Sequence, residues 1–542
     1  MKNFTLSVPT PVNEPIYAYA PGDARRESLV QRLNTMAAEK IEIPCVIGGK
    51  EVRTGNKKTV VMPHDHGHVL AEFHLAGESE LRAAAQAALA AKAKWENLHW
   101  SERAAIFLKA ADLLAGPWRD TLNAATMLGQ SKSVYQAEID SACELIDFLR
   151  FNVSFYQDLL KQQPISSPGV WNQLEYRALE GFVLAITPFN FTAIAGNLPA
   201  APAMLGNTVV WKPSDTQVLS AWYTMKLFEE AGLPPGVINF VPADGPLTGR
   251  TLVSHPDLAG IHFTGSTSTF QSLFKSVGEN ISRYKTYPRL VGETGGKDFV
   301  FAHASADAEA LSTALIRGAF EYQGQKCSAA SRAYIPKSLW AKVQDRMISE
   351  IATIRLGDVR DFSCFMNAVI DARSHQKVSG YLDHAKNASD ARILTGGKAR
   401  GEKGFFVDPT VVLTTNPKFK TMAEEIFGPV LTVYTYDEKD FEQTLDLCDA
   451  TSPYALTGAI FAQDRQVLVQ MSQRLKNAAG NFYVNDKPTG AVVGQQPFGG
   501  ARASGTNDKA GSPLNLYRWL SPRTIKETFN PPKDYRYPFL AK

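Results

Sequence analysis

The chain has 542 residues, of which 44% are hydrophobic and 20% are charged, and its 57 basic and 54 acidic residues leave a formal charge of only +3. A single hydrophobic core stops growing at about 250–300 residues, so we expect two large domains. The small net charge gives no reason to expect a nucleic acid partner. Apolar stretches such as Phe182–Pro188 fall far short of the ~20 residues that a membrane-spanning helix needs, so we expect no membrane partner.

The N-terminal residues and the cysteines bear on the compartment. Residues 1–30 contain Glu14 and a late Arg25–Arg26 pair but lack the apolar centre of a secretory signal, and they fit a basic, acid-poor import sequence poorly. The five cysteines are odd in number and show no CxxC spacing, which argues against a disulfide framework or a zinc ribbon. We therefore expect a reducing compartment, the cytoplasm of a bacterium or the mitochondrial matrix of a eukaryote.

The first part of the chain contains a hairpin and a group of helices. Residues 59–74 alternate apolar and polar side chains around an Asp65–Gly67 turn, which predicts a β-hairpin. Residues 78–161 are rich in Ala, Leu, Glu, Lys and Gln, with apolar residues at helical spacing. This pattern predicts several packed helices.

Short β-rich runs then alternate with helical segments. The clearest predicted helix, Gln217–Ala231, is closed by Gly232 and Pro234. The predicted strands around it are Phe182–Ile186, Thr208–Trp211, Val237–Val241 and Gly260–Phe263. Such alternation implies a parallel sheet with crossover helices on both faces, and ligands of such sheets bind at the carboxyl ends of the strands.

A second α/β series follows. Its predicted elements are the strand Phe299–Ala302, the helix Ala306–Tyr322, the strand Ala333–Ile335, the helix Leu339–Ile354 and the strand Val430–Tyr436. The C-terminal segment Tyr517–Phe539 contains a strand candidate, Thr524–Thr528, but has little apolar surface for a core of its own. We expect this segment to be an arm that lies on another subunit.

Cys327 is the candidate nucleophile. It follows a predicted helix, beside Lys326 and near a run of backbone amides. A neighbouring cation lowers the pKa of a thiol, and the thiolate is the form that attacks a carbonyl carbon. Taken alone, this local context favours a buried structural cysteine slightly over a reactive one.

Two further residues have chemistry suited to acyl transfer. Glu293 lies in the glycine-rich stretch Leu290–Lys297, where a carboxylate can activate water, although a glutamate in such a loop is more often part of a surface turn. Asn190 follows the strand Phe182–Ile186, and its amide can donate to an oxyanion. The alternative for Asn190 is that its side chain satisfies loop backbone.

Two predicted strand ends are candidates for binding a dinucleotide. Phe263–Thr267 ends a strand and opens a helix, a geometry in which backbone amides meet a phosphate, although Gly-Ser-Thr is also an ordinary helix cap. No GxGxxG follows a predicted strand, so the ordinary Rossmann fingerprint is missing. Lys212 and Ser214 can hydrogen-bond a ribose, and Asp215 would repel a 2′-phosphate, which favours NAD over NADP.

The segment His64–His68 carries three imidazoles and a carboxylate. We interpret it as an exposed hairpin turn, which has no preformed geometry for a metal ion. We therefore expect no metal site.

Seven ordered motifs resemble those of the aldehyde dehydrogenase superfamily, along about residues 40–530. They are Thr187–Asn190, Trp211–Ser214, Phe263–Ser266, Glu293–Lys297, Gly324–Cys327, Glu424–Pro429 and Pro497–Gly500. The resemblance implies an NAD-dependent oxidation of an aldehyde and a homodimer or higher homo-oligomer. It also implies an N-terminal arm at residues 1–40, a parallel-sheet NAD-binding domain at 41–164 and 181–292, an α/β catalytic domain at 293–514, and a β oligomerisation flap at 165–180 and 515–542.

The resemblance also assigns roles to residues. Cys327 is the implied nucleophile, Asn190 with the Cys327 amide the oxyanion hole, and Glu293 the base for thioester hydrolysis. Lys212, Ser214 and Asp215 would hold the adenosine ribose, Ser266 the pyrophosphate, and Glu425 with Phe427 the nicotinamide half. The other implied cofactor contacts are Ile186, Thr187, Pro188, Phe189, Gly245, Phe263, Thr264, Gly265, Thr294 and Gly295. Two positions depart from the usual pattern: Phe270 stands where the cofactor motif often has glycine, and Asp215 stands in place of a glutamate.

A finer resemblance is to members that oxidise glutamate semialdehyde, the open form of pyrroline carboxylate, to glutamate in proline catabolism. It rests on Asn13–Pro15, Tyr17, Tyr19, Phe191–Asn197, Tyr284–Pro288 and Val492–Phe498. Such a substrate has an α-carboxylate that needs donors, and the resemblance implies Ser328 and the amides of Gly490 and Ala491. Phe191, Lys326 and Phe498 complete the implied substrate site. Some relatives have serine where this chain has Ala491, so one side-chain donor is absent here.

Three alternatives to this function stay open at this point. They are an aldehyde dehydrogenase for another semialdehyde, a catalytically silent protein of the same fold, and a cysteine hydrolase. The last needs a histidine partner, and no histidine neighbours Cys327 in the sequence.

Overall fold

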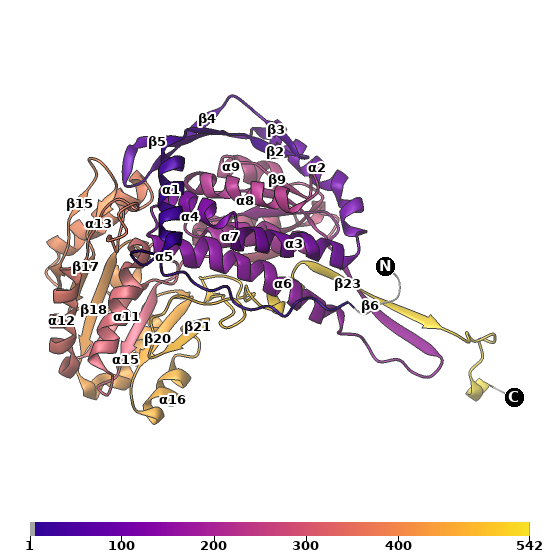
Figure 1. Ribbon diagram of the computed structural model, residues 1–542. Coiled ribbons are helices and arrows are strands. Elements are labelled where there is room, and N and C mark those ends of the chain that lie inside the picture. The colour runs from indigo at the N-terminus through magenta and orange to yellow at the C-terminus, as the bar shows by residue number, and fades with distance from the viewer. Residues whose placement is uncertain (1–5, 541–542) are drawn as a thin grey trace.

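Two seven-stranded sheets organise the chain, which the computed structural model describes from residue 6 to residue 540 (Figure 1). Each sheet carries helices on both faces, so the predicted α/β fold with parallel sheets is confirmed. Among residues 6–540 we find no helix that is both long enough and apolar enough to cross a bilayer.

Five adjacent strands of the first sheet run parallel, and two short antiparallel strands extend its edge. In spatial order the strands are β11 (Arg289–Glu293), β10 (Leu258–Thr264), β7 (Phe182–Ile186), β8 (Thr208–Lys212), β9 (Ile238–Phe240), β2 (Cys45–Ile47) and β3 (Lys50–Val52). The register pairs Ile186 with both Lys212 and Phe263, so these strands end at one common edge.

The strands of the first sheet are apolar on both faces because helices cover both. Phe182 and Leu184 of β7 belong to one buried cluster, and Val183 and Ala185 to another, as the two-residue period of a strand requires. The first cluster lies under α2 (Glu78–Glu96), α9 (Gly245–Thr248) and α10 (Thr267–Glu279). The second lies under α3 (Trp100–Ala115), α4 (Arg119–Gln130), α6 (Leu145–Leu160), α7 (Thr192–Met204) and α8 (Val218–Ala231).

The second sheet has six parallel strands and one antiparallel edge strand. Its order is β14 (Ala391–Thr395), β17 (Thr410–Thr414), β18 (Val430–Tyr436), β13 (Ala330–Pro336), β12 (Asp298–Ala302), β20 (Thr457–Phe461) and β21 (Asn481–Val484). One face packs on α11 (Ala308–Phe320) and α12 (Lys337–Ile351), and the other on α13 (Ala372–Asn387), α15 (Phe441–Ala450) and α16 (Arg465–Arg474).

The predicted helix Ala306–Tyr322 ends earlier than expected. Helix α11 stops at Phe320, and a short 3₁₀ turn follows at Glu321–Gly324. Within that turn Tyr322 and Gln323 adopt positive φ angles of 51° and 56°, which an α-helix cannot contain. This left-handed turn directs the chain toward Cys327, three residues beyond it.

The predicted hairpin is present, but its turn was predicted wrongly. The strands are β4 (Lys57–Met62) and β5 (Asp65–His74), and Met62 pairs with Asp65. The chain therefore reverses at Pro63 and His64 rather than at Asp65–Gly67, because proline holds a φ angle that suits a turn. The register then shifts, so that residues 66–68 have no partner in β4, and the pairing resumes at Val69 opposite Val61.

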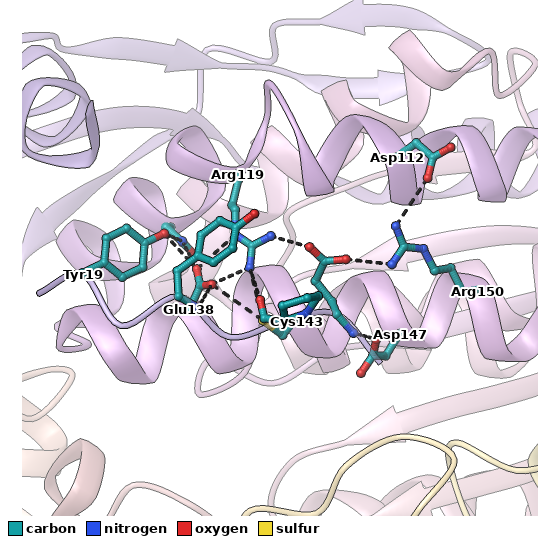
Figure 2. A network of polar contacts seen from close by, with 11 residues as sticks. Tyr19, Asp112, Arg119, Glu138, Cys143, Asp147 and Arg150 are labelled. Atoms are coloured by element: carbon teal, nitrogen blue, oxygen red, sulfur yellow. Dashed lines mark hydrogen bonds and ion pairs between the residues drawn. The ribbon is translucent and has the colours of Figure 1, made fainter. Parts of the chain in front are cut away.

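The N-terminal residues lie against the first α/β body. Helix α1 (Ala24–Ala38) packs on α4 and buries Leu29 and Leu33 in the same hydrophobic cluster as Val183 and Ala185, which we call the larger core. Preceding residues run across α4, η1 (Glu138–Glu144) and α6, where polar contacts hold them (Figure 2).

A two-stranded antiparallel sheet projects from the body (Figure 1). It pairs β6 (Val170–Ala178) with β23 (Leu520–Thr528), one strand from each of the segments 165–180 and 515–542. The second strand begins four residues before the predicted Thr524, since the pairing extends back to Leu520 opposite Ala178.

Candidate active site

The candidate cofactor residues lie at the carboxyl edge of the first sheet. Thr187–Phe191 follows β7, Lys212–Asp215 closes β8, and Thr264–Ser266 closes β10. Glu293 ends β11 opposite Thr264. The fold thus brings these residues, which are far apart in the sequence, to the edge of the sheet at which ligands of open α/β sheets bind.

Asp215 is held by two lysines. Lys58 Nζ of β4 lies 2.8 Å from Asp215 Oδ2, and Lys212 Nζ lies 3.9 Å from Asp215 Oδ1. Burial lowers the pKa of the Lys212 ammonium. Sequence reasoning missed Lys58, which lies 157 positions from Asp215. The carboxylate and Lys212 can hydrogen-bond the hydroxyls of a ribose.

Ser266 begins α10, as predicted for the phosphate end of the site. Its Oγ accepts a hydrogen bond from the Thr269 amide at 3.2 Å, so it is the N-cap of a 13-residue helix whose N-terminus favours an anion. The unusual Phe270 stacks on Phe263 with ring centroids 5.4 Å apart. A Cβ on Gly292 would lie 2.2 Å from Phe270 Cζ, so Phe270 fills the space beside Gly292 and Glu293.

The other implied cofactor residues are distributed along the same edge. Trp211 Nε1 donates to Thr187 Oγ1 at 3.0 Å, and Thr294 Oγ1 donates to the Ala503 carbonyl at 2.6 Å. Gly245 begins the short helix α9 and is exposed. Phe427 lies before β18 of the second sheet, and its ring meets Phe189 edge to face with centroids 5.7 Å apart, so the segment after β7 contacts the second body there.

Residues 294–297 cross from the first sheet to the second. Glu293 ends β11, and Asp298 begins β12. A Cβ on Gly295 would lie 2.5 Å from Glu425 Oε1, and a Cβ on Gly296 would lie 2.2 Å from the Cys327 carbonyl oxygen. These glycines therefore allow the crossing to touch both the Glu425 carboxyl and the Cys327 backbone.

Cys327 is half-buried, whereas the other four cysteines are buried. Burial raises the pKa of its thiol well above the ordinary value, and the carboxyl groups of Asp298, Glu293 and Glu425 raise it further. The expectation that Lys326 ionises the thiol is therefore wrong. The buried Lys326 Nζ lies instead 3.2 Å from Glu321 Oε2, which also pairs with Lys487.

Asn190 is buried beside the loop that carries Cys327. Its Nδ2 donates to the Gln325 carbonyl at 3.0 Å, two residues before Cys327. An amide nitrogen carries two hydrogens, so the second remains for an oxyanion. Helix α7 begins at Thr192, two residues after Asn190.

The Glu293 side chain points toward the loop that contains Gly500. Its Oε2 accepts a hydrogen bond from the Gly500 amide at 3.1 Å. Burial raises the pKa of the carboxyl well above its usual range. A carboxyl with a raised pKa is a stronger base once it is ionised, which is the property that water activation needs.

Of the implied substrate residues, the structure links Ser328 to the segment that precedes Gly490 and Ala491. The Ser328 hydroxyl lies 2.8 Å from Thr489 Oγ1, and Thr489 precedes Gly490 and Ala491. Gly490 has a φ of +97°, a conformation that favours glycine. Phe498 pairs through its backbone with Ala510, at the far end of the same loop.

Sequence reasoning missed a buried pair behind Phe191. Lys132 Nζ lies 2.7 Å from Asp140 Oδ2 and 4.1 Å from the centroid of the Phe191 ring. Asp140 also accepts the amides of Thr192 and Ala193 at the start of α7. The pair thus fixes the helix start that follows Asn190, and no local pattern in the sequence marks it.

Three other titratable groups near the site, the buried Lys297 and Asp298 and the half-buried Glu144, have shifted pKa values. Burial lowers the pKa of Lys297 to about 7, and among the described residues its Nζ has no hydrogen-bond partner. Burial raises the pKa of Asp298 to about 8. Burial and the neighbouring Asp140 raise the pKa of Glu144 to about 8.

The imidazoles of His64–His68 point to separate partners. His66 Nε2 contacts the Gly401 carbonyl at 2.8 Å, and His68 Nε2 contacts the Ala37 carbonyl at 2.7 Å. The expected exposure of the segment is wrong for His64, which is buried with Nε2 3.4 Å from Asp358 Oδ1. Within residues 6–540 no group of three or more His, Cys, Asp or Glu side chains is arranged to hold a metal ion.

Comparison with known proteins places this geometry in a family. The aldehyde dehydrogenase family matches residues 51–525. Delta-1-pyrroline-5-carboxylate dehydrogenase, mitochondrial, from Dictyostelium discoideum is 53% identical over 537 residues, which cover 98% of this chain and 96% of that protein. The protein of the same name from Homo sapiens is 51% identical over 529 residues, which cover 97% and 94%.

The structure is also similar to a crystal structure of Delta-pyrroline-5-carboxylate dehydrogenase from Mycobacterium tuberculosis bound with NAD. The TM-score is 0.97 and the identity 56%, and all of each chain is covered. The seven motifs, the two sheets and the match over residues 51–525 agree, and the chain belongs to the aldehyde dehydrogenase family.

Proposed function

We propose that the chain oxidises L-glutamate γ-semialdehyde, the open form of 1-pyrroline-5-carboxylate, to L-glutamate with NAD as the hydride acceptor, in proline catabolism. The observation that carries the proposal is the joining of Cys327, through Ser328 and Thr489, to the Gly490 and Ala491 amides. The thiol and the proposed carboxylate donors then lie on two segments that this hydrogen bond joins. The relatives above carry names for this activity at about half identity over nearly the whole chain.

The residues at the sheet edge fit a dinucleotide. The N-terminus of α10 at Ser266 suits the pyrophosphate, and Lys212 with Asp215 suits a ribose. Glu425 accepts the Gly296 amide at 3.0 Å, which holds its carboxyl beside the crossing segment and near the nicotinamide end. When bound there, NAD supplies the acceptor for the hydride.

Cys327 forms the first bond. Its sulfur adds to the aldehyde carbon, and the thiol proton passes to the Glu293 carboxylate, the base among the acidic groups that raise the thiol pKa. The oxygen of the aldehyde becomes an oxyanion, which accepts the free hydrogen of Asn190 Nδ2 and the Cys327 amide. Loss of a hydride from the same carbon then leaves a thioester on Cys327.

Hydrolysis of the thioester uses Glu293 a second time. After it has released the first proton, its carboxylate takes a proton from water, and the hydroxide adds to the thioester carbon. The C–S bond then breaks, and glutamate leaves while the sulfur regains a proton. The Gly500 amide holds the carboxyl from one side, so its other oxygen is free for the water.

We further propose a homodimer or a higher homo-oligomer in which the β6–β23 sheet contacts a second subunit. Both strands project from the body, and the residues after β23 expose large apolar side chains such as Phe529 and Phe539. Two relatives are named as mitochondrial. We therefore propose the mitochondrial matrix for a eukaryotic source and the cytoplasm for a bacterial one.

The experiment that tests the substrate follows NADH absorbance with three kinds of aldehyde. Pyrroline carboxylate should give the highest kcat/KM, ahead of succinic semialdehyde, which lacks the α-amino group, and of simple aliphatic aldehydes, which lack the carboxylate. Equal values for all three would refute glutamate semialdehyde as the substrate.

A further inference from the structure

The N-terminal segment around residues 13–19 is fixed by buried charges (Figure 2). The Arg119 side chain, 4% exposed, lies 2.6 Å from Glu14 Oε1 and also pairs with Glu138. Arg150 Nη1 lies 2.7 Å from Glu14 Oε2, and Tyr19 Oη donates to Glu138 at 2.9 Å. An ion-pair network with this burial holds one geometry, so the segment is part of the body rather than a loose tail.

Asn13 uses this fixed position to hold a distant loop. Its Nδ2 donates to Asp147 Oδ2 of α6 at 2.7 Å and to the Val493 carbonyl at 2.9 Å. Its Oδ1 accepts from Gln495 Nε2 at 2.8 Å. Asp147 in turn accepts the Glu14 amide at 2.7 Å, which fixes the carboxylate that orients the Asn13 side chain.

The loop that Asn13 holds begins next to Gly490 and Ala491, whose amides are the proposed donors to the substrate carboxylate. Val492–Gln495 is a turn, in which the Gln495 amide donates to the Val492 carbonyl at 3.0 Å. Val493 is buried in the larger core, and a Cβ on Gly494 would lie 2.4 Å from Phe151 of α6. The turn starts one residue after Ala491, so the peptide that carries the Ala491 amide lies just before it in the chain.

We propose that Asn13 is a positioning residue for the substrate's α-carboxylate, acting through the turn Val492–Gln495 on the amides of Gly490 and Ala491. The inference rests on the proposed function and deepens it. Asn13 meets both the acceptor Val493 and the donor Gln495, so it fixes the turn in position and in orientation. Without these bonds the turn gains conformational freedom, and ordering the amides around a carboxylate becomes less favourable.

The substitution Asn13→Ala tests the proposal by comparing two substrates. It should raise KM for glutamate semialdehyde about tenfold, the loss typical of one hydrogen-bonded contact, and leave kcat/KM for propanal within about twofold. Asn13→Asp should have a larger effect in the same direction, because it removes the donor to Val493 and puts a second carboxyl beside Asp147. Inhibition by the product L-glutamate should weaken in parallel with the rise in KM.

Two further variants keep the test independent of folding. Gln495→Ala removes one bond from an exposed side chain and should raise KM for glutamate semialdehyde by a smaller factor. Val12→Ala changes a neighbouring side chain that is 70% exposed, and should change neither substrate. Differential scanning fluorimetry of each variant reports whether the fold is intact.

The outcomes separate the two proposals. Unchanged KM in both Asn13→Ala and Gln495→Ala, or an equal loss for glutamate semialdehyde and propanal, would overturn the positioning role. A wild-type protein that prefers propanal would instead overturn the proposed function, and with it the carboxylate that Asn13 is inferred to position. A selective loss in both variants supports the inference.

Discussion

Replacing Glu293 by glutamine should stop the reaction at the thioester. Glutamine has the same shape, and its side-chain oxygen can still accept the Gly500 amide that Glu293 accepts at 3.1 Å, so the local structure should persist. What is lost is the proton acceptor for water. A positioned general base contributes about 10²–10⁴-fold to a rate, so hydrolysis should slow by that factor, equivalent to about 3–5 kcal/mol of barrier.

The assay is a rapid-mixing experiment that follows NADH. With pyrroline carboxylate the Glu293→Gln variant should give a burst of about one NADH per Cys327, followed by a slow phase, and mass spectrometry of the quenched protein should find the thioester. The burst should slow as well, if less, because Glu293 also accepts the thiol proton. A steady-state rate within threefold of wild type, with no thioester, would refute the reasoning.

The pH dependence of the rate provides a second test of the role of Glu293. The base works as a carboxylate, and burial raises the pKa of Glu293, so less of it is ionised at a given pH than for an ordinary glutamate. The rate of thioester hydrolysis by the wild-type enzyme should therefore increase as the pH rises toward that raised pKa. The Glu293→Gln variant should lose this dependence. Glu425→Gln is the matched control: it alters another half-buried glutamate that accepts a glycine amide, and it should raise KM for NAD without trapping a thioester.

Three further predictions concern the nucleophile, the cofactor and the N-terminal network. Cys327→Ala should reduce NADH formation by at least about 10³-fold while isothermal titration still detects NAD binding, and appreciable turnover by this variant would exclude Cys327 as the nucleophile. Asp215→Asn should raise kcat/KM for NADP relative to NAD about tenfold, since it removes the charge that repels a 2′-phosphate and leaves Lys58 and Lys212 in place; an unchanged ratio would show that Asp215 does not set the preference. Glu138→Gln should destabilise the protein by about 3–5 kcal/mol, because Arg119 loses a partner that is fully buried, and an unchanged thermal midpoint would contradict this.

The elements that the sequence predicted well are those with a strong local pattern. The strand Phe182–Ile186 has the predicted bounds because it is apolar on both faces and is limited by Gly181 and Pro188. Helix α8 ends at Ala231 because Gly232 adopts a φ of +101°. The end of α11 was missed because Tyr322 and Gln323 enter the left-handed region, which neither residue type favours.

For the candidate site, the motifs predicted which strand ends matter but not what holds their side chains. Lys326 is next to Cys327 in the sequence, and only the tertiary structure shows that its ammonium turns to Glu321. Asn13 and Gln495 are 482 positions apart, and such a contact leaves no local pattern in either segment. The predicted roles of Asn190 and Glu293 stay predictions, because they depend on where a substrate lies.

The crossing at residues 294–297 connects Glu293, at the end of β11, to the backbone of Cys327 by a few consecutive peptide units. Its two glycines have no spare room, since a methyl group on either would enter the Glu425 carboxyl or the Cys327 carbonyl. Because the crossing packs closely on both sides, a rotation of one sheet against the other should move Glu293 and the loop that carries Cys327 together. Substitutions that alter the angle between the two bodies, however distant from the cleft, should therefore change bond formation and water attack together.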